Sequence, residues 1–169
     1  MFFRHPLTIS IEKGVAPDGR SSCQDTISGH SGINRGATFT SGAVGGAMEF
    51  NGSNYVEVPD TADLDPRLGD YSMEAWIKIP VGSKGQRRAI AHGSHGNGGF
   101  DGLSLVEWCA WGNVPCGGVG LLLGVDGAGE RLVGTCQAMD DGQFHHYAGV
   151  IKRGESMQLY VDGALLTSP

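Results

Sequence analysis

The clearest pattern along the chain is a series of short apolar stretches separated by turn residues. Residues 71–79 alternate strictly between apolar and polar positions, which places Met73, Ala75, Ile77 and Ile79 on one face of a strand. The opposite face carries Glu74, Trp76 and Lys78. Such alternation is typical of a strand with one buried and one polar face. Residues 118–125 are apolar on both faces, which predicts a central strand.

The same pattern predicts further strands at Leu7–Ile11, Ala47–Phe50, Tyr55–Val58, Ala89–Gly93, Gly102–Trp108, Arg131–Cys136, Phe144–Lys152 and Met157–Val161. The pairs Asn51-Gly52 and Asp162-Gly163 predict type I′ hairpin turns, whose two central residues need positive φ. A single helical turn is expected within residues 61–68, and no longer window has a helical period. Residues 18–41 are expected to form a surface loop or a region tethered by Cys23. The sequence therefore predicts an all-β fold, a two-sheet antiparallel sandwich.

Composition supports this fold class and removes several functions. Glycine supplies 29 of the 169 residues without a fixed period, which excludes collagen and disfavours helices. The formal net charge is −6, and the densest basic run, residues 84–88, is explained by a solvated loop. We expect no nucleic-acid partner, because such proteins normally present a basic patch. We also expect no membrane span, because no apolar run approaches the required ~20 residues.

The four cysteines predict an oxidising compartment. Cys109 and Cys116 flank a turn-rich hexapeptide that can bring them face to face, so we predict a disulfide between them. Cys23 and Cys136 are then the second pair. A zinc site is disfavoured, since the cysteines lack the paired spacing and nearby histidines that zinc prefers.

Two blocks of sequence carry a family resemblance. The first is Gly45–Asp60 followed by Tyr71–Lys78, and the second is Phe144–Val150 followed by Leu159–Gly163. Asp25–Gly29 adds an Asp-Thr-Ile-Ser-Gly loop. Together these segments resemble the laminin G-like domains of the concanavalin A-like lectin/glucanase superfamily, which open with an Asp-x-Ser-Gly loop. The resemblance is specific for the fold and weaker for function, because one sandwich hosts many activities.

The resemblance implies a jelly roll of two antiparallel sheets, extracellular or on a cell surface, that often binds glycans and calcium. It divides the chain into an N-terminal strand and loop, residues 1–24, and a laminin G-like sandwich, residues 25–169. Domains of this kind continue beyond the Val-Asp-Gly hairpin with further strands, whereas this sequence ends at Pro169. We therefore expect an open position in the sandwich, filled either by strands from another protein chain or by Leu7–Ile11. The alternative is that the sequence is a fragment of a larger protein.

The candidate ligand-binding residues lie in two segments. Trp108 and Trp111, on or beside the predicted disulfide loop, offer aromatic surfaces on which sugar rings stack. The alternative places Trp108 in the core and Trp111 as a surface plug. His92, His95 and Asp101 lie in a long segment predicted to be a flexible loop, and supply polar contacts. Trp76 is assigned a structural role, as in the family.

Calcium is the one expected metal. Asp60, Asp63 and Asp65 place three carboxylates within six residues, with Asn51 in the neighbouring hairpin, and calcium takes six to eight such oxygens. The alternative for these residues is ordinary turn and cap chemistry. His145 and His146 are adjacent in a strand, so they point to opposite faces and do not chelate one metal together.

The sequence favours a binding protein over an enzyme. Glucanases of this superfamily carry Glu-x-Asp-x-Glu on one strand, which places acid and nucleophile on one face, and that motif is absent. Gly-x-Ser-x-Gly and the phosphate-binding glycine motifs are absent as well. The predicted function is therefore a non-catalytic module that binds extracellular carbohydrate, as free glycan or on a glycoprotein. The alternative is a structural subunit completed by a neighbouring chain, and a glycan-active enzyme comes third.

Overall fold

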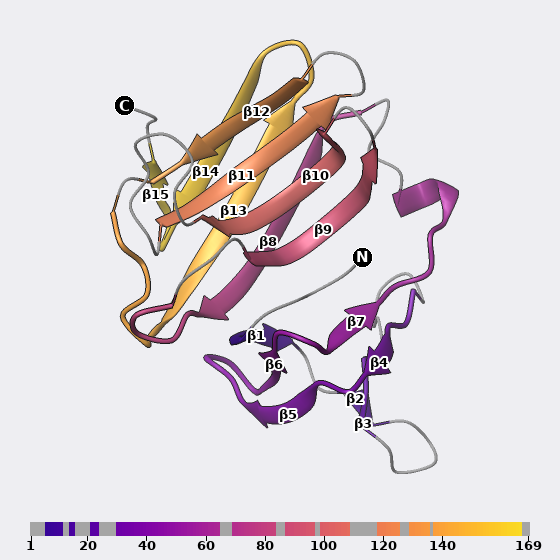
Figure 1. Cartoon of the computed structure of the whole chain (residues 1–169), viewed down its shortest axis with the longest axis vertical. Coiled ribbons are helices and arrows are strands. Elements are labelled where there is room, and N and C mark those ends of the chain that lie inside the picture. Colours follow the sequence, from indigo (N-terminus) through magenta and orange to yellow (C-terminus); the bar gives the residue numbers. More distant parts are fainter. Residues whose placement is uncertain are drawn as a thin grey trace.

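The protein is an antiparallel two-sheet sandwich with nearly all of its regular structure in strands (Figure 1). The structure, a computed structural model, describes residues 6–11, 14–15, 21–23, 30–64, 69–83, 87–96, 99–108, 118–125, 129–135 and 137–166. Its seven-stranded sheet has the order β15 (Ala164–Leu166), β14 (Ser156–Val161), β13 (Phe144–Lys152), β8 (Tyr71–Lys78), β1 (Pro6–Ile11), β6 (Gly46–Asn51) and β5 (Thr38–Ser41).

The second layer is a four-stranded sheet in the order β12 (Gly129–Gly134), β11 (Gly118–Val125), β10 (Gly99–Trp108) and β9 (Arg87–Gly96). Figure 1 shows this sheet stacked over β8, β13 and β14. Two short pairs complete the strands, β2 (Gly14–Val15) with β3 (Ser21–Ser22), and β4 (Ile33–Arg35) with β7 (Tyr55–Glu57). The short 3-10 helix η1 (Ala62–Leu64) lies within the segment where one helical turn was expected.

Most of the predicted strands are confirmed, and the predicted flexible loop is not. Residues 92–96 and 99–102 instead lie on the paired strands β9 and β10, with His92 opposite Leu103. The ladder continues through Gly93 and Gly102, whose φ angles of 131° and 137° suit glycine alone. Segment 18–41, expected to be a loop or a tethered region, also contains strands, β4 and β5 among them. These strands form by pairing with β7 and β6, and their own polar sequences do not predict them.

One of the two expected I′ turns is confirmed. Asp162 and Gly163 have φ angles of 49° and 79°, as that turn requires. Asn51 is different, because among the described residues Asp162 is the only non-glycine residue with positive φ. The Asn51 carboxamide oxygen instead accepts hydrogen bonds from the backbone N–H groups of Ser53 and Asn54 at 2.9 and 3.3 Å. Side-chain bonding of this kind stabilises a wider turn without left-handed backbone at its first residue.

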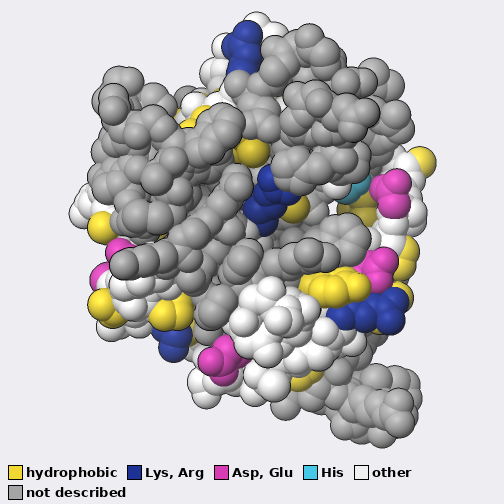
Figure 2. All heavy atoms as spheres, in the orientation of Figure 1, with side chains coloured by type: hydrophobic (Ala, Val, Ile, Leu, Met, Phe, Trp, Pro, Cys, Tyr) yellow, Lys and Arg dark blue, Asp and Glu magenta, His cyan; other side chains and the backbone are white. Residues whose placement is uncertain are grey.

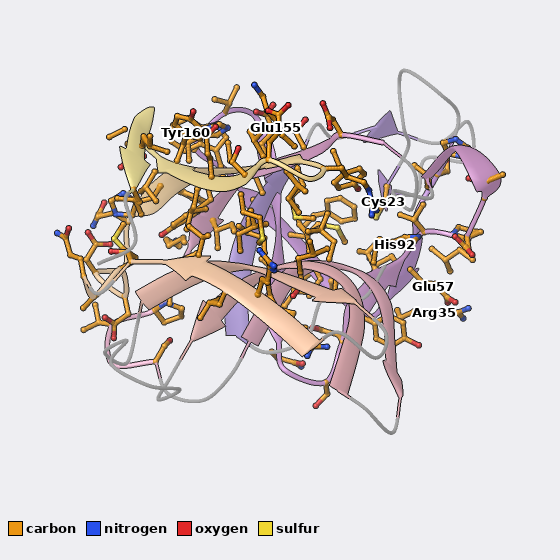
Figure 3. The ribbon with its side chains drawn as sticks, turned by 90° about the horizontal axis from the view of Figure 1, so that it is seen from above. Cys23, Arg35, Glu57, His92, Glu155 and Tyr160 are labelled. Carbon is orange, nitrogen blue, oxygen red and sulfur yellow. The ribbon has the colours of Figure 1, made fainter. Side chains whose placement is uncertain are left out.

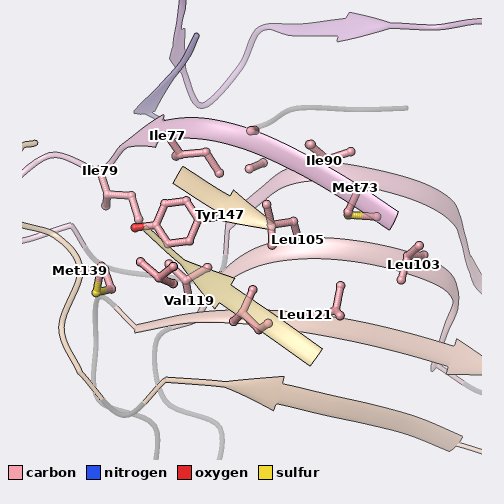
Figure 4. Close-up of a cluster of buried hydrophobic side chains, with 14 of the residues drawn as sticks. Met73, Ile77, Ile79, Ile90, Leu103, Leu105, Val119, Leu121, Met139 and Tyr147 are labelled. Atoms are coloured by element: carbon pink, nitrogen blue, oxygen red, sulfur yellow. The ribbon is translucent and has the colours of Figure 1, made fainter. Parts of the chain in front are cut away.

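The core lies between the two sheets and follows the alternation seen in the sequence. Tyr147 on β13 is fully buried and packs among apolar side chains from both layers, Leu105, Leu121, Val119, Ile77 and Ile79 among them (Figure 4). Gly149 keeps the layers close, because a Cβ at this position would lie 2.6 Å from Cδ1 of Leu121 on β11. Met48, Phe50 and Val56 extend the same cluster under the N-terminal strands.

The N-terminal strand is a central member of the larger sheet. β1 pairs with β6 from Pro6↔Asn51 to Ile11↔Gly46, and with β8 from Thr8↔Lys78 to Ser10↔Trp76. Of the two sources considered for the open position, β1 of the same chain thus lies between β6 and β8. Without it, the described pairings would divide the sheet into a β15-β14-β13-β8 part and a β6-β5 part.

The backbone contact at Gly102 gives a first testable prediction. A Cβ there would meet the carbonyl oxygen of His92 and lie 2.7 Å from the Gly93 Cα, both in backbone that cannot yield easily. We expect Gly102→Ala to lower the free energy of unfolding by at least ~2 kcal/mol, measured by urea denaturation. The control is Gly69→Ala, where a Cβ meets nothing within 4 Å. Equal stability of the two variants would contradict the close approach of β9 and β10.

Candidate functional site

The predicted polar cluster is assembled only in part. His92 lies near the middle of β9, whereas the backbones of His95 and Asp101 lie on β9 and β10 toward the hairpin tip. The cross-strand partner of His95 is Phe100 and that of Asp101 is Ser94. The side chains of His95 and Asp101 are outside the described part of the structure, so their role stays a prediction.

The structure brings together one residue from each of two predicted sites. The His92 Nε2 atom lies 3.3 Å from Oδ1 of Asp60, which follows β7. The Asp60 side chain is 84% exposed and that of His92 is 23% exposed, so this pair is largely solvated. Exposed pairs of this kind contribute about 0–1 kcal/mol to stability. Figure 3 shows His92 on the same side of the molecule as Arg35 and Glu57, whose ion pair of 3.1 Å joins β4 to β7.

The expected calcium ligands fit that metal poorly where they are described. The Asn51 oxygen already accepts two backbone hydrogen bonds, which occupy its lone pairs. Asn54 is buried, accepts from the Asn51 N–H at 2.9 Å and donates to the Gly36 carbonyl at 2.9 Å. Within the described residues, no group of three His, Cys, Asp or Glu side chains is arranged to hold a metal ion. The calcium prediction now depends on Asp60 and on two side chains outside the described part, Asp63 and Asp65.

For the predicted disulfide loop and its two tryptophans, the structure describes only the flanking strands, β10 and β11. Trp108, the last residue of β10, is the cross-strand partner of Gly118, the first residue of β11. The side chain of Trp108 and all of Trp111, Cys109 and Cys116 fall outside the described residues. Sugar stacking by these tryptophans and the disulfide between these cysteines therefore stay predictions.

Cys23 does not form the second predicted disulfide. Its thiol is free and donates to the Met48 sulfur at 3.4 Å. Burial raises the pKa of this thiol, which keeps it protonated and unreactive. The pairing with Cys136 is therefore wrong, because Cys23 contributes to packing beside the core cluster instead.

A row of aromatic side chains occupies the outer side of the seven-stranded sheet. Because β8, β13 and β14 bury alternate residues against the four-stranded sheet, the intervening residues face outward. Four of these side chains define what we call the aromatic face: Trp76, Phe144, His146 and Tyr160. All four are partly exposed. Figure 3 shows Tyr160 on the side of β14 that points away from the four-stranded sheet.

Each ring of the aromatic face has a polar or charged neighbour. The Trp76 and His146 rings are tilted by 55° with centroids 5.2 Å apart, and His146 Nε2 lies 3.7 Å from a Glu74 carboxylate oxygen. The Lys78 ammonium lies 5.2 Å from the centroid of the Phe144 ring. The Tyr160 hydroxyl donates to the Gln158 side-chain oxygen at 3.3 Å. The surface therefore combines apolar ring area with hydrogen-bonding groups.

This surface was missed at the sequence level although its signal was present. The sequence placed Trp76 on the polar side of its strand, which is correct, but assigned it a structural role. Cross-strand register supplies the missing information, because it puts His146 opposite Trp76 and Phe144 opposite Lys78. The expectation that His145 and His146 face opposite ways is confirmed, since His145 instead meets Asp141 and Asp162.

The distribution of charge and hydropathy over the described residues indicates no further binding surface. On the molecular face in Figure 2, described side chains of both charge signs are interspersed. No helix within the described ranges has the length and apolar character needed to cross a bilayer.

Comparison with known proteins fixes the family. No curated protein and no solved structure matches the chain. The sequence model of a laminin G-like family, described as the Concanavalin A-like lectin/glucanases superfamily, matches residues 50–169. That stretch contains β8, β13 and β14, which carry the aromatic face, and all four strands of the second sheet. The chain therefore belongs to the laminin G-like family of the concanavalin A-like lectin/glucanases superfamily.

Proposed function

We propose that this protein is a non-catalytic carbohydrate-recognition module that binds extracellular or cell-surface glycans through its aromatic face. The observation that carries the proposal is the contact between the tilted rings of Trp76 and His146 beside Glu74. Membership of a lectin/glucanase superfamily supports it.

Sugars are amphipathic, and the aromatic face has matching chemistry. A pyranose ring presents C–H groups that pack on an aromatic surface, while its hydroxyls both donate and accept hydrogen bonds. Glu74 supplies an acceptor whose side chain is 74% exposed, and Gln158 supplies an amide beside Tyr160. The rings are held by neighbours on paired strands, so little side-chain freedom is lost when a ligand binds.

The distribution of carboxylates supports binding without catalysis. Glycoside hydrolysis normally uses two carboxyl groups on either side of the scissile bond. Among the described outward-facing side chains of β8, β13 and β14, Glu74 is the only carboxylate. A glycan bound to these described side chains would therefore meet one carboxylate and not the pair that glycoside hydrolysis normally uses.

Replacing Trp76 tests the proposal. We expect Trp76→Ala to weaken glycan binding at least tenfold, about 1.4 kcal/mol, because it removes the largest ring of the face. The measurement is a glycan array followed by calorimetry on the best binder, with chelator present and absent. Tyr55→Ala on β7 is the matched control, because it removes an aromatic side chain from the separate β4–β7 pair, outside the seven-stranded sheet.

Two further results would redirect the proposal. Binding that survives Trp76→Ala but is lost in Trp108→Ala or Trp111→Ala would move the site to the predicted disulfide loop. Absence of binding to every glycan by folded wild-type protein would reject carbohydrate recognition altogether.

A second candidate function is assembly by strand exchange, and the central position of β1 favours it. In domain swapping, a strand leaves its own sheet and a second copy supplies the same strand in its place. Departure of β1 would expose two unpaired edges, on β6 and β8, each a template for an incoming strand. We infer that copies of this chain can exchange β1 at high concentration.

Cross-linking between register partners tests this exchange. Thr8 on β1 and Glu49 on β6 are partners, so Thr8→Cys with Glu49→Cys in one chain should form an internal disulfide. We expect the two single variants, refolded together, to give a disulfide-linked dimer on non-reducing gels. Thr8→Cys mixed with Glu155→Cys, and the wild type with its native cysteines, are the controls. An internal link in the double variant with no dimer in the mixture would reject exchange, and absence of both would reject the β1–β6 register.

A further inference from the structure

A cluster of three titratable side chains lies where β13 begins and the β14–β15 hairpin turns. His145, the second residue of β13, lies with Nδ1 2.6 Å from Oδ2 of Asp162 and with Nε2 3.1 Å from Oδ2 of Asp141. Asp141 precedes β13, and Asp162 opens the turn between β14 and β15. The imidazole ring therefore bridges two carboxylates from separate segments.

This arrangement requires a protonated ring to be fully bonded. A neutral imidazole has one N–H donor and one lone pair, whereas an imidazolium has two donors. In the neutral form, one ring nitrogen would direct its lone pair at a carboxylate. The geometry thus favours the charged form of His145, with one N–H donated to each aspartate.

The ionisation equilibria follow the geometry. Partial burial alone would lower the pKa of His145, but its hydrogen bonds to Asp162 and Asp141 outweigh burial and raise the pKa above the ordinary 6.5. The N–H of Gln143 and the imidazole together lower the pKa of Asp141. For Asp162, burial alone would raise the pKa, and the hydrogen bonds from His145 and the His146 N–H reverse this and lower it.

The two aspartates are anchored on different parts of the fold. Asp162 accepts the backbone N–H of His146 at 2.9 Å through its other oxygen, and its own N–H donates to the His146 carbonyl at 2.9 Å. Asp141 accepts from the Gln143 N–H at 2.8 Å, within a loop whose Gly142 N–H donates to the Ile79 carbonyl. His145 therefore links the β14–β15 hairpin to the loop beside the end of β8.

No other described charge competes for the ring. On β13, the centroid of the uncharged Tyr147 ring lies 6.3 Å from that of His145, and His146 points to the outer face. The partner of His145 on β8 is the apolar Ile77. Asp140 in the same loop accepts the Gly82 N–H at 3.0 Å. Lys78 lies on the outer face over the Phe144 ring.

We propose that His145, Asp141 and Asp162 form a pH-sensitive clamp that holds the β14–β15 hairpin against β13 and so maintains the aromatic face. The carboxylate that binds His145 also binds the backbone of His146, and Asp162 lies two residues after Tyr160 in the chain. Tyr160 is the cross-strand partner of Ala148, two residues from His146 on β13, so opening of the hairpin would displace Tyr160 from the aromatic face. The effect on ligand binding rests on the proposed function, whereas the effect on the hairpin does not.

The direction of the pH effect follows from linkage. A histidine with a raised folded-state pKa contributes its full stability below about pH 6.5 and loses it as the pH rises through the folded-state value. The aspartates, with lowered values, contribute above about pH 4 and lose stability as the pH falls. The clamp is therefore closed at mildly acidic pH and weakens above pH 6.5.

Hydrogen exchange and NMR titration test the clamp in the whole 169-residue chain. We expect the His145 imidazole to titrate with a midpoint above 6.5, and the protection of the Asp162, His146 and Ala164–Leu166 amides to fall as the pH rises above that ordinary value. After correction for the intrinsic exchange rate, each unit by which the pKa exceeds 6.5 corresponds to about a tenfold loss of protection. Where a glycan ligand is found, its affinity should fall over the same range.

Variants separate the clamp from a general pH effect. Asp141→Asn keeps an acceptor oxygen but removes a charge, so the loss of protection should move to lower pH. His145→Gln should remove the pH dependence, and His30→Gln, which replaces a histidine outside the cluster, should leave it intact. Unchanged pH dependence in His145→Gln, or a His145 midpoint at or below 6.5, would overturn the clamp. A working clamp without any glycan binding would instead overturn the proposed function alone.

Discussion

The register between β8 and β13 is the constraint on which the rest of the molecule depends. These strands pair from Phe144↔Lys78 to Ile151↔Tyr71, and the side-chain period of two sorts every residue into core or surface. The same register buries Tyr147 beside Ala75 and brings His146 onto Trp76. A slip of one residue would turn the core side chains to water and bury the aromatic face. Both the stability and the chemistry of the domain therefore depend on one set of backbone hydrogen bonds.

Features that depend on neighbouring residues could be predicted from the sequence, whereas contacts between distant segments could not. The alternation in residues 71–79 is a local pattern, and the structure reproduces its buried face, with Ile77 3% exposed. The partnership of His146 with Trp76 and that of His145 with Asp162 join segments 70 and 17 residues apart, and both depend on tertiary register. Strands β4 and β5 were missed for a related reason, since their sequences are polar and pairing alone orders them.

The predicted calcium ligands show a different error. Oxygen-bearing residues that are close in the sequence suggested a metal site, but in the structure Asn51 serves the backbone of its own turn. Asn51 lies near the acidic run in sequence, yet its oxygen is already committed to the Ser53 and Asn54 amides. Oxygen-rich turns and calcium sites use the same residue types, and only the hydrogen bonds distinguish them. His92 shows the converse. His92 was a predicted ligand-binding residue and Asp60 a predicted calcium ligand, yet the two side chains are in contact, because β9 passes beside the segment that follows β7.

The aromatic face and the N-terminal strand meet at the same edge of β8. Ser10 on β1 is the partner of Trp76, and Thr8 is the partner of Lys78, so β1 continues the surface that carries the rings. A ligand spanning Trp76 and β1 would bind only the assembled sheet, and by mass action would oppose departure of the strand. A free β8 edge would, conversely, leave Trp76 without its neighbour on that side. The proposed glycan recognition therefore needs β1 in place, whether it comes from the same chain or from a second copy, and a bound ligand should slow strand exchange by disfavouring the open state.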